Sequence, residues 1–250
     1  QRKIIVRKGD LLRYGYARMK ELNNIPALTS FNLAMENFPE LNSRKMKLES
    51  EKASLKSRRI GDSRIFEIEK ELREIRQQIR SYEGNLVEKA KIVGTTISKA
   101  VVDAVVYKKS SFDIVILDEA SMVYIPQACF AAGLAKKHFI CFGDFRQLTP
   151  IAQSETPIVE RWLLQDIYEH LNISTDIDKE KYHPWLVLLN EQRRMHPKIS
   201  WFVNSKVYNM NLCDHPKVEA KLKTITEKFP FAGHAISMID LISTCNVCSK

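Results

Sequence analysis

Apolar residues recur along the middle of the chain with the period of a helix. Between residues 65 and 86 they stand three or four positions apart, at Ile65, Ile68, Leu72, Ile75, Ile79, Tyr82 and Leu86. This spacing is typical of the seam of a coiled coil. The preceding segment carries a thinner stripe with a seven-residue repeat, at Leu41, Leu48 and Leu55. We therefore expect an antiparallel helical hairpin over residues 42–86.

The pattern then changes to short apolar runs that alternate with helical stretches. The runs are Lys91–Val93, Ile114–Leu117, Phe139–Phe142 and Trp185–Leu189, and each ends in a polar or glycine-containing loop. Short runs of this kind predict parallel strands. Helices are expected between and after them, over residues 125–135, 157–171 and 197–208. A further strand-like run covers Ile4–Val6. The sum is a doubly wound α/β fold with a helical insertion.

Composition narrows the class of protein. The chain has 250 residues, of which 44% are hydrophobic, and five are cysteines. No apolar run approaches the roughly 18 residues that span a bilayer, so we expect a soluble intracellular protein with no membrane partner. An odd number of cysteines without regular spacing fits a reducing compartment.

The net charge of +9 is compatible with a polyanionic partner, although many basic proteins have none. Residues 44–91 hold 14 Lys and Arg against 9 Asp and Glu, and so contribute much of this excess. Two interpretations stay open for the hairpin: a solvated charged face, which interspersed signs favour, or a track for nucleic acid.

The loops after the strands carry the candidate chemistry. In the segment FDIVILDEASM, residues 112–122, an apolar strand ends in Asp118 and Glu119. Buried carboxylates are costly unless they are paired or hold a metal. The next strand is followed by GDFRQLTP, residues 143–150, and the last by EQRRMHP, residues 191–197. Ligands of such sheets bind at the carboxyl ends of the strands, so these loops predict one site.

Taken together, DEAS, GDFRQLTPIAQS and NEQRRMHPKIS resemble motifs II, III and IV of superfamily 1 helicases. The likeness is to the 5′-to-3′ branch that contains the nonsense-mediated-decay helicase and the senataxin group. KIVGTTISKA, residues 91–100, resembles the nucleic-acid-contacting motif that precedes motif II in that branch. The resemblance implies a RecA-like parallel sheet flanked by helices, with the hairpin as an inserted stalk.

The resemblance also implies cofactors and roles. It implies ATP and Mg²⁺, with Asp118 holding the metal and Glu119 acting on the attacking water. Gln147 matches the position of a γ-phosphate sensor, and Arg194 matches the arginine that reaches the nucleotide cleft. The family commonly has an aromatic residue where this chain has Arg193, which leaves open which guanidinium faces phosphate.

The nucleic-acid contacts have two interpretations. By resemblance, Gly94, Thr95, Thr96 and Ser98 offer small side chains and backbone N–H groups to phosphate oxygens. Threonine and serine after a strand also serve as helix caps. Pro150 either lies against the strand being moved or ends a helix or turn.

The expected organisation is a segment of a larger motor. Residues 1–41 and 87–212 would form the first RecA-like domain, 42–86 the stalk, and 213–250 a linker and the start of a second RecA-like domain. The phosphate-binding sequence G-x-x-x-x-G-K-[ST] does not occur in the chain and is expected upstream of residue 1. The partners implied are single-stranded DNA or RNA and the flanking parts of the same polypeptide.

The function implied is that of a monomeric helicase or translocase motor in the cytoplasm or nucleus, inactive as this segment alone. The alternative is an ATPase-inactive module with a RecA-like fold that binds nucleic acid or protein. Cys245 and Cys248, with Cys213 and His215, could complete four zinc ligands, but ordinary thiols are the better interpretation of one such pair.

Overall fold

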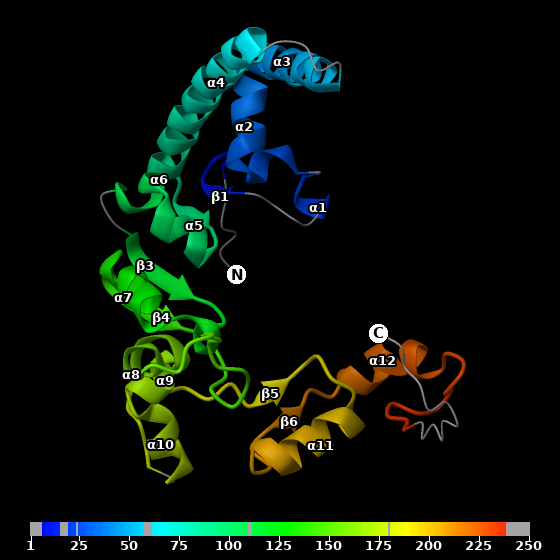
Figure 1. Cartoon of the computed structure of the whole chain (residues 1–250). Helices are drawn as coiled ribbons and strands as arrows, with labels where there is room; N and C mark the ends of the chain where they lie inside the picture. The colour runs from blue at the N-terminus through cyan, green and yellow to red at the C-terminus, as the bar shows by residue number, and fades with distance from the viewer. Residues whose placement is uncertain are drawn as a thin grey trace, which may run out of the picture. The chain divides into compact units, whose positions relative to one another are not determined.

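The computed structural model describes residues 7–15, 20–23, 25–57, 62–109, 112–179 and 181–238. The chain divides into two compact units, Gln1–Asn172 and Ile173–Lys250 (Figure 1). The expected strand at Ile4–Val6 lies outside the described residues, as do residues 239–250, which include Cys245, Cys248 and part of the expected start of a second RecA-like domain.

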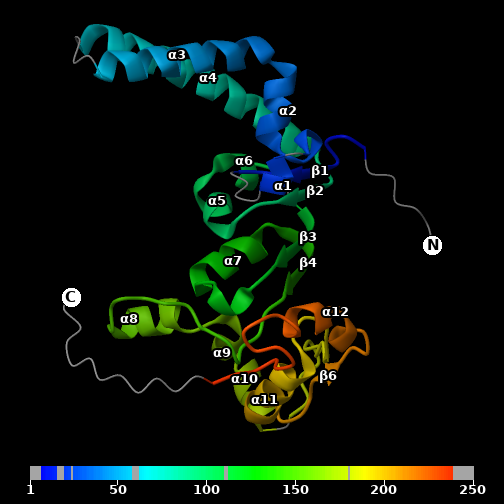
Figure 2. The same ribbon diagram turned by 90° about the vertical axis from the view of Figure 1, so that its right-hand side faces the viewer.

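Two long helices occupy the segment where the apolar spacing predicts them. They are α3, Pro39–Ser57, and α4, Asp62–Lys89, and they pack side by side (Figure 2). Ion pairs join Arg44 to Glu71 at 2.5 Å and Arg64 to Glu51 at 2.8 Å. Because the later residue of α3 pairs with the earlier residue of α4, the two helices run antiparallel.

The apolar stripes of the two helices meet in one core. Its buried members are Ala34, Leu48, Ile68, Leu72, Ile75 and Ile79, with Leu41, Leu55 and Tyr82 partly buried against them. The seam predicted by spacing is thus confirmed. Ala34 comes from α2, Ser30–Asn37, so this short helix belongs to the same layer. That the pair is an inserted stalk stays a prediction.

A second core lies where α4 ends. Its buried members are Leu12, Tyr14, Leu33, Val87, Ala90, Ala100 and Val106. It gathers β1, Leu11–Arg13, and its parallel partner β2, Ile92–Gly94, with the short helices α5, Ile97–Val102, and α6, Ala104–Tyr107. A 3₁₀ turn at Pro26–Leu28 and α1, Lys20–Asn23, complete this region. The core thereby fixes α4 to the strand that precedes α5.

The strands predicted around the candidate motifs are β3, Phe112–Leu117, and β4, Ala135–Cys141, which pair in parallel. A 3₁₀ turn, Ala120–Met122, and α7, Ile125–Gly133, form the crossover, and α7 packs against both strands. The apolar run at residues 112–117 is typical of a strand buried on both faces, but the described residues do not bury β3 in this way. Ile114 and Ile116 are 50% and 61% exposed, because no described element covers their face.

The single helix predicted over residues 157–171 is also wrong. The segment contains α8, Pro157–Val159, a π-helical turn, Glu160–Leu164, and α9, Ile167–His170. The break occurs at Asp166, whose Oδ1 accepts hydrogen bonds of 2.8 Å from the backbone N–H groups of Tyr168 and Glu169. This N-cap starts a new helix instead of continuing the old one.

The second unit is mainly helical. It contains α10, Ile173–Asp178, α11, Pro197–Val207, and α12, Val218–Thr226. A two-residue strand β5, Glu191–Gln192, pairs with β6, Cys213–Asp214. Residues 197–208 were predicted as a helix with proline in its first turn, and α11 confirms this.

The strand predicted at Trp185–Leu189 does not form. Trp185 and Val187 are 87% and 81% exposed, and the strand of this region is β5, a few residues later. A strand requires a hydrogen-bonded neighbour, and the described residues of this unit supply one only to Glu191–Gln192. In the described part of the chain the strands form three separate parallel pairs, so the single RecA-like sheet stays a prediction.

Candidate active site

The loops after β3 and β4 are joined by backbone hydrogen bonds. The N–H of Phe142 donates to the carbonyl of Leu117, and the N–H of Ala120 donates to the carbonyl of Phe142, each at 2.8 Å. Each loop therefore begins beside the other. This arrangement brings together the predicted residue pair Asp118 and Glu119 and the loop that carries Gln147.

Asp118 and Glu119 are both exposed at the end of β3. Glu119 adopts a left-handed conformation with φ 53° and ψ 43°, which is uncommon for a residue with a side chain. Its N–H donates to Oδ1 of Asp118 at 3.1 Å. Strained backbone of this kind persists where the surroundings enforce it and often marks a functional site.

Gly143 explains how the two loops approach so closely. A Cβ atom at this position would lie 3.1 Å from the backbone nitrogens of Ala120 and Ser121 and 3.0 Å from the hydroxyl of Tyr168. Real Cβ atoms rarely come this close to backbone atoms. Glycine therefore avoids contacts that would force the neighbouring atoms to shift by a few tenths of an ångström.

Gln147 is held by the acid of its own loop. Its side-chain amide donates to Oδ2 of Asp144 at 2.8 Å, and its N–H donates to the carbonyl of Asp144 at 3.0 Å. Oδ1 of the same carboxylate accepts from the N–H of Arg146 at 3.0 Å. Asp144 thus shapes a tight turn that leaves Gln147 exposed on the loop beside Asp118 and Glu119.

Sequence reasoning missed Tyr168, which lies on α9 under these loops. The tyrosine is 6% exposed, and its ring lies 5.8 Å from that of Phe145. Burial, together with nearby negative charges that include Asp166 and Asp144, raises the pKa of Tyr168 to about 12. The phenol therefore stays protonated and keeps its hydroxyl beside Gly143. In the sequence, only the spacing of Tyr168 from the N-cap residue Asp166 could have indicated that the tyrosine lies on a helix.

The hydroxyl of Ser121, in the turn after Glu119, was also not anticipated. It is buried and has no hydrogen-bond partner among the described residues. An unpaired buried hydroxyl costs about 1–3 kcal/mol.

Arg194 lies in the second unit, in a turn held by Gln192. The carbonyl oxygen of the Gln192 side chain accepts from the N–H groups of Arg194 and Met195, at 2.9 and 2.8 Å. The two arginines differ in their partners. Arg193 forms an ion pair with Glu191 at 2.6 Å, whereas the Arg194 guanidinium has no partner among the described residues. Arg194 is therefore the guanidinium left available for a ligand.

The residues predicted to contact nucleic acid run from the end of β2, at Gly94, through Thr95 and Thr96 to the first turn of α5, at Ser98. Oγ1 of Thr96 caps α5 by accepting from the N–H of Lys99 at 3.2 Å, as the capping interpretation requires. Oγ1 of Thr95 is buried without a partner among the described residues. Gly94 and Ser98 are exposed. The Gly94 carbonyl accepts a hydrogen bond of 2.9 Å from the N–H of Tyr14, so only the hydroxyl groups of Thr95 and Ser98 are left unused among the described contacts.

A buried polar network supports this loop from behind. The Tyr14 hydroxyl donates to Oδ2 of Asp103 at 2.8 Å, and Nζ of Lys99 lies 2.6 Å from the same oxygen. Burial alone would raise the pKa of Asp103, but hydrogen bonds from Lys99, the Val105 N–H and Tyr14 hold it below its usual value. The network ties the end of α5 to β1.

Pro150 is buried, and the carbonyl of the next residue, Ile151, accepts a hydrogen bond from the Tyr124 hydroxyl at 2.8 Å. A buried ring has little surface to offer a nucleic acid. The structure therefore favours the interpretation that Pro150 ends a turn.

The carboxylates at the end of β3 suit a magnesium ion. Mg²⁺ prefers hard oxygen ligands and is commonly held by one or two carboxylates together with waters and substrate phosphates. Asp118 offers an exposed carboxylate of this kind. Among the described residues no cluster of three or more His, Cys, Asp or Glu could hold a metal by itself.

Comparison with known proteins places the chain in a family. Residues 16–155 match the model of a family described as an AAA domain. Over 160 residues, or 62% of the chain, the sequence is 34% identical to the "DNA polymerase alpha-associated DNA helicase A" of Schizosaccharomyces pombe. It is 26% identical to "Helicase sen1" of the same organism over 140 residues, and 27% identical to the human "NFX1-type zinc finger-containing protein 1" over 154 residues.

The protein belongs to the AAA-domain family and, within it, to the superfamily 1 helicases of the nonsense-mediated-decay helicase and senataxin group. The chain spans 22% of the length of the first relative and 8% of the other two. No helix in the described part of the chain is both long enough and apolar enough to cross a membrane.

Proposed function

We propose that this chain is the motor segment of an ATP-dependent helicase or translocase that moves on single-stranded DNA or RNA. The observation that carries the proposal is the junction of the β3 and β4 loops. There two exposed carboxylates, one on a strained left-handed residue, adjoin the Gln147 loop. The helicases named among its relatives support the same class of activity.

Each residue has a role in this proposal. Asp118 would hold Mg²⁺, which when bound neutralises charge on the nucleotide phosphates. The carboxylate of Glu119 orients the attacking water and accepts its proton. The amide of Gln147, which donates a hydrogen bond to Asp144 in the turn, would sense the terminal phosphate.

Arg194 is the arginine proposed to approach the nucleotide, because Arg193 is already paired with Glu191. Gly94, Thr95 and Ser98 are proposed to contact the phosphates of the strand, with Thr96 retained as the cap of α5. The RecA-like sheet, the stalk formed by α3 and α4, and the division at residues 41, 86 and 212 belong to the same proposal.

Glu119→Gln tests the central role. The amide keeps the shape of the side chain but does not accept a proton, so single-turnover ATP hydrolysis should slow by about 10²–10⁴-fold while ATP and single-stranded DNA still bind. The measurement uses the polypeptide that carries this segment together with its phosphate-binding loop. Asp118→Ala should instead weaken Mg²⁺-dependent ATP binding.

Glu155→Gln is the matched control, because Glu155 is an exposed acid in the loop after residue 150. It should hydrolyse ATP at the wild-type rate. Wild-type hydrolysis by Glu119→Gln would refute the assignment. A wild type that binds single-stranded DNA but has no ATPase activity would favour the ATPase-inactive module instead.

A further inference from the structure

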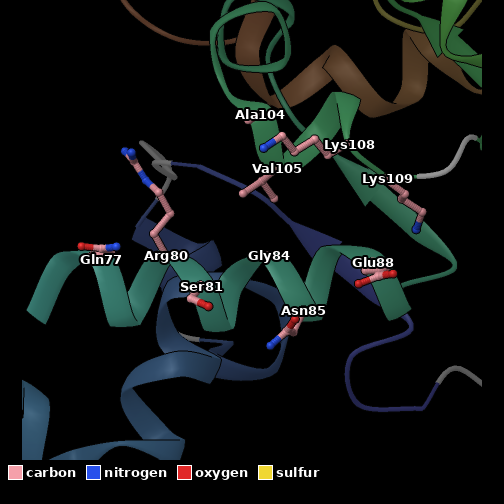
Figure 3. Close-up of a pocket in the computed structure, with 10 residues that line it drawn as sticks. All are labelled: Gln77, Arg80, Ser81, Gly84, Asn85, Glu88, Ala104, Val105, Lys108 and Lys109. Carbon is pink, nitrogen blue, oxygen red and sulfur yellow. The ribbon is translucent and has the colours of Figure 1, made fainter. Parts of the chain in front are cut away.

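A groove runs between α4 and α6, away from the loops of the candidate active site. It has a volume of about 470 Å³ and is lined by Gln77, Arg80, Ser81, Gly84, Asn85 and Glu88 of α4 and by Ala104, Val105, Lys108 and Lys109 of α6 and the turn after it (Figure 3). The lining residues of α4 lie on the side of that helix opposite its apolar seam. The groove is therefore not part of the hairpin core.

Backbone contacts fix the two walls. Nζ of Lys109 donates to the carbonyls of Val87 and Ala90, at 2.8 and 2.7 Å. These carbonyls belong to the end of α4, where helical partners run out. Burial lowers the pKa of Lys109, as expected for an amine inside this junction. Lys109 thus holds the turn after α6 to the end of α4.

Gly84 keeps the floor open. A Cβ atom on this residue would lie 3.6 Å from a methyl group of Val105, an ordinary contact, whereas a longer side chain would fill the space. Glycine inside a helix costs about 1 kcal/mol relative to alanine. Its presence in the C-terminal part of α4 therefore costs helix stability but leaves space at the groove floor.

The charges of the groove are arranged for an anion. Arg80 and Lys108 reach from opposite walls (Figure 3), and neither has an ion-pair or hydrogen-bond partner within the described ranges. The acid of the lining, Glu88, has the charge of Lys109 near it. Gln77, Ser81 and Asn85 add neutral hydrogen-bonding groups to the lining. The lining offers cations and polar donors, with Val105 and Ala104 as its few apolar members.

We propose that this groove binds the phosphodiester backbone of a nucleic acid strand, without reading its bases. Phosphate oxygens are bound in proteins by Arg and Lys together with Ser, Asn and Gln, which is the set present here. An acidic peptide is the less suitable ligand, because protein partners anchor through buried aromatic and apolar side chains, for which the groove has no pocket. The inference rests on the proposed function, and it adds a contact surface outside the helicase motifs.

The groove also continues the surface that the proposed function assigns to the strand. The loop at residues 94–96 begins α5, and α6 follows α5 after one residue, Asp103. The network of Tyr14, Lys99 and Asp103 holds these two helices together at that residue. A strand that leaves the loop along α5 and α6 would therefore reach Lys108 and Arg80.

The test measures binding of a fluorescent oligo-dT by this 250-residue chain between 50 and 200 mM salt. If Arg80 and Lys108 each contact one phosphate, the double variant Arg80→Gln/Lys108→Gln should lower the slope of log K against log salt by about 1.4. Over that fourfold range of salt, wild-type binding should then weaken about sevenfold more than binding by the variant. Ser81→Glu, which places a negative charge in the groove, should also weaken binding of oligo-dT relative to the wild-type chain.

Matched controls remove the same charge elsewhere. Lys47→Gln/Lys136→Gln changes two exposed lysines outside the groove, and Ser54→Glu adds an acid on the exposed side of α3. Both should keep the wild-type slope. The proposal is overturned if the control pair lowers the slope as much as the groove pair, if the groove pair leaves it unchanged, or if the wild-type chain does not bind oligo-dT at 50 mM salt.

Binding of poly-glutamate that is lost in the groove pair, with an unchanged slope for oligo-dT, would identify an acidic peptide as the ligand and also overturn the proposal. These outcomes do not depend on catalysis. If Glu119→Gln leaves ATP hydrolysis intact while the groove pair lowers the oligo-dT slope, the proposed motor fails and the groove stands.

Discussion

Glu119 combines a chemical role with an unfavourable backbone. Its φ of 53° places it in the left-handed region, which costs a residue with a Cβ atom roughly 1–2 kcal/mol. The conformation turns the chain directly after β3, so that both carboxylates stand clear of the strand. A glycine would form this turn more easily but would carry no carboxylate. Such a conflict between the backbone conformation and the identity of the side chain is expected at a functional position.

The left-handed backbone at position 119 can be tested by measuring the stability of variants at that position. At position 119, glycine should give a more stable protein than alanine, by about 1 kcal/mol, because only alanine pays for the left-handed backbone. At position 74, an exposed residue of α4, the order should reverse, because glycine destabilises a helix by about 1 kcal/mol relative to alanine. Urea unfolding of the four variants measures both differences. Alanine being the more stable residue at both positions would show that the left-handed conformation is not kept in solution.

Residue identities in the motifs could be read from the sequence, but their surroundings could not. The order of DEAS and GDFRQLTP predicted two adjoining loops, since parallel strands end at the same edge. The left-handed φ of Glu119 and the close approach at Gly143 depend on hydrogen bonds between residues more than twenty positions apart. Tyr168 was missed for the same reason, because it meets these loops only through the fold.

At the scale of elements, α2 and α4 are joined by a polar contact at the base of the hairpin. The Ser30 hydroxyl donates to Oε1 of Glu83 at 2.5 Å, and Ser30 is fully buried. Burial raises the pKa of Glu83 above its usual value, and the Ser30 hydrogen bond and the charge of Lys99 only partly oppose this effect. The carboxylate is therefore easier to bury when it is protonated.

The sign of the resulting pH dependence follows from the raised pKa. A carboxyl group of this kind contributes stability that is fully present below its unfolded pKa of about 4.3 and is lost as pH rises through the folded value. Glu83→Gln removes the charge and should raise the melting temperature at pH 7, with a gain that shrinks as pH falls towards 4. Glu74→Gln, on the exposed side of the same helix, should leave the melting temperature nearly unchanged. A loss of stability for Glu83→Gln that is equal at all pH values would contradict this account.

The spacing of apolar residues correctly predicted the elements whose packing partners lie nearby in the sequence. The stripe from Ile68 to Ile79 fixes which side of α4 is buried, and the structure places those residues in one core. It failed where partners are distant. Trp185–Leu189 has the composition of a buried strand, but its large apolar side chains are exposed. Composition alone does not predict whether a neighbouring strand is present for pairing. The apolar spacing of residues 157–171 did not reveal the break at Asp166, because the spacing is the same for one continuous helix as for two helices separated by an N-cap.

At the scale of the whole chain, the groups proposed for ATP hydrolysis come from both units. Asp118, Glu119 and Gln147 belong to Gln1–Asn172, and Arg194 belongs to Ile173–Lys250. The sequence also lacks the glycine-rich loop that cradles the β- and γ-phosphates.

The 250-residue chain by itself should therefore release phosphate from ATP at the rate of the buffer, even with Mg²⁺ and single-stranded DNA present. Catalytic carboxylates act only on a nucleotide held in place, and fixed geometry supplies much of the barrier reduction in phosphoryl transfer. Phosphate release should be measured with the wild-type chain and Glu119→Gln side by side, using a polypeptide that includes the phosphate-binding loop as the positive control. Equal background rates for the two chains are expected. DNA-stimulated release by the wild-type chain that disappears in Glu119→Gln would show instead that residues within this segment bind the phosphates without that loop.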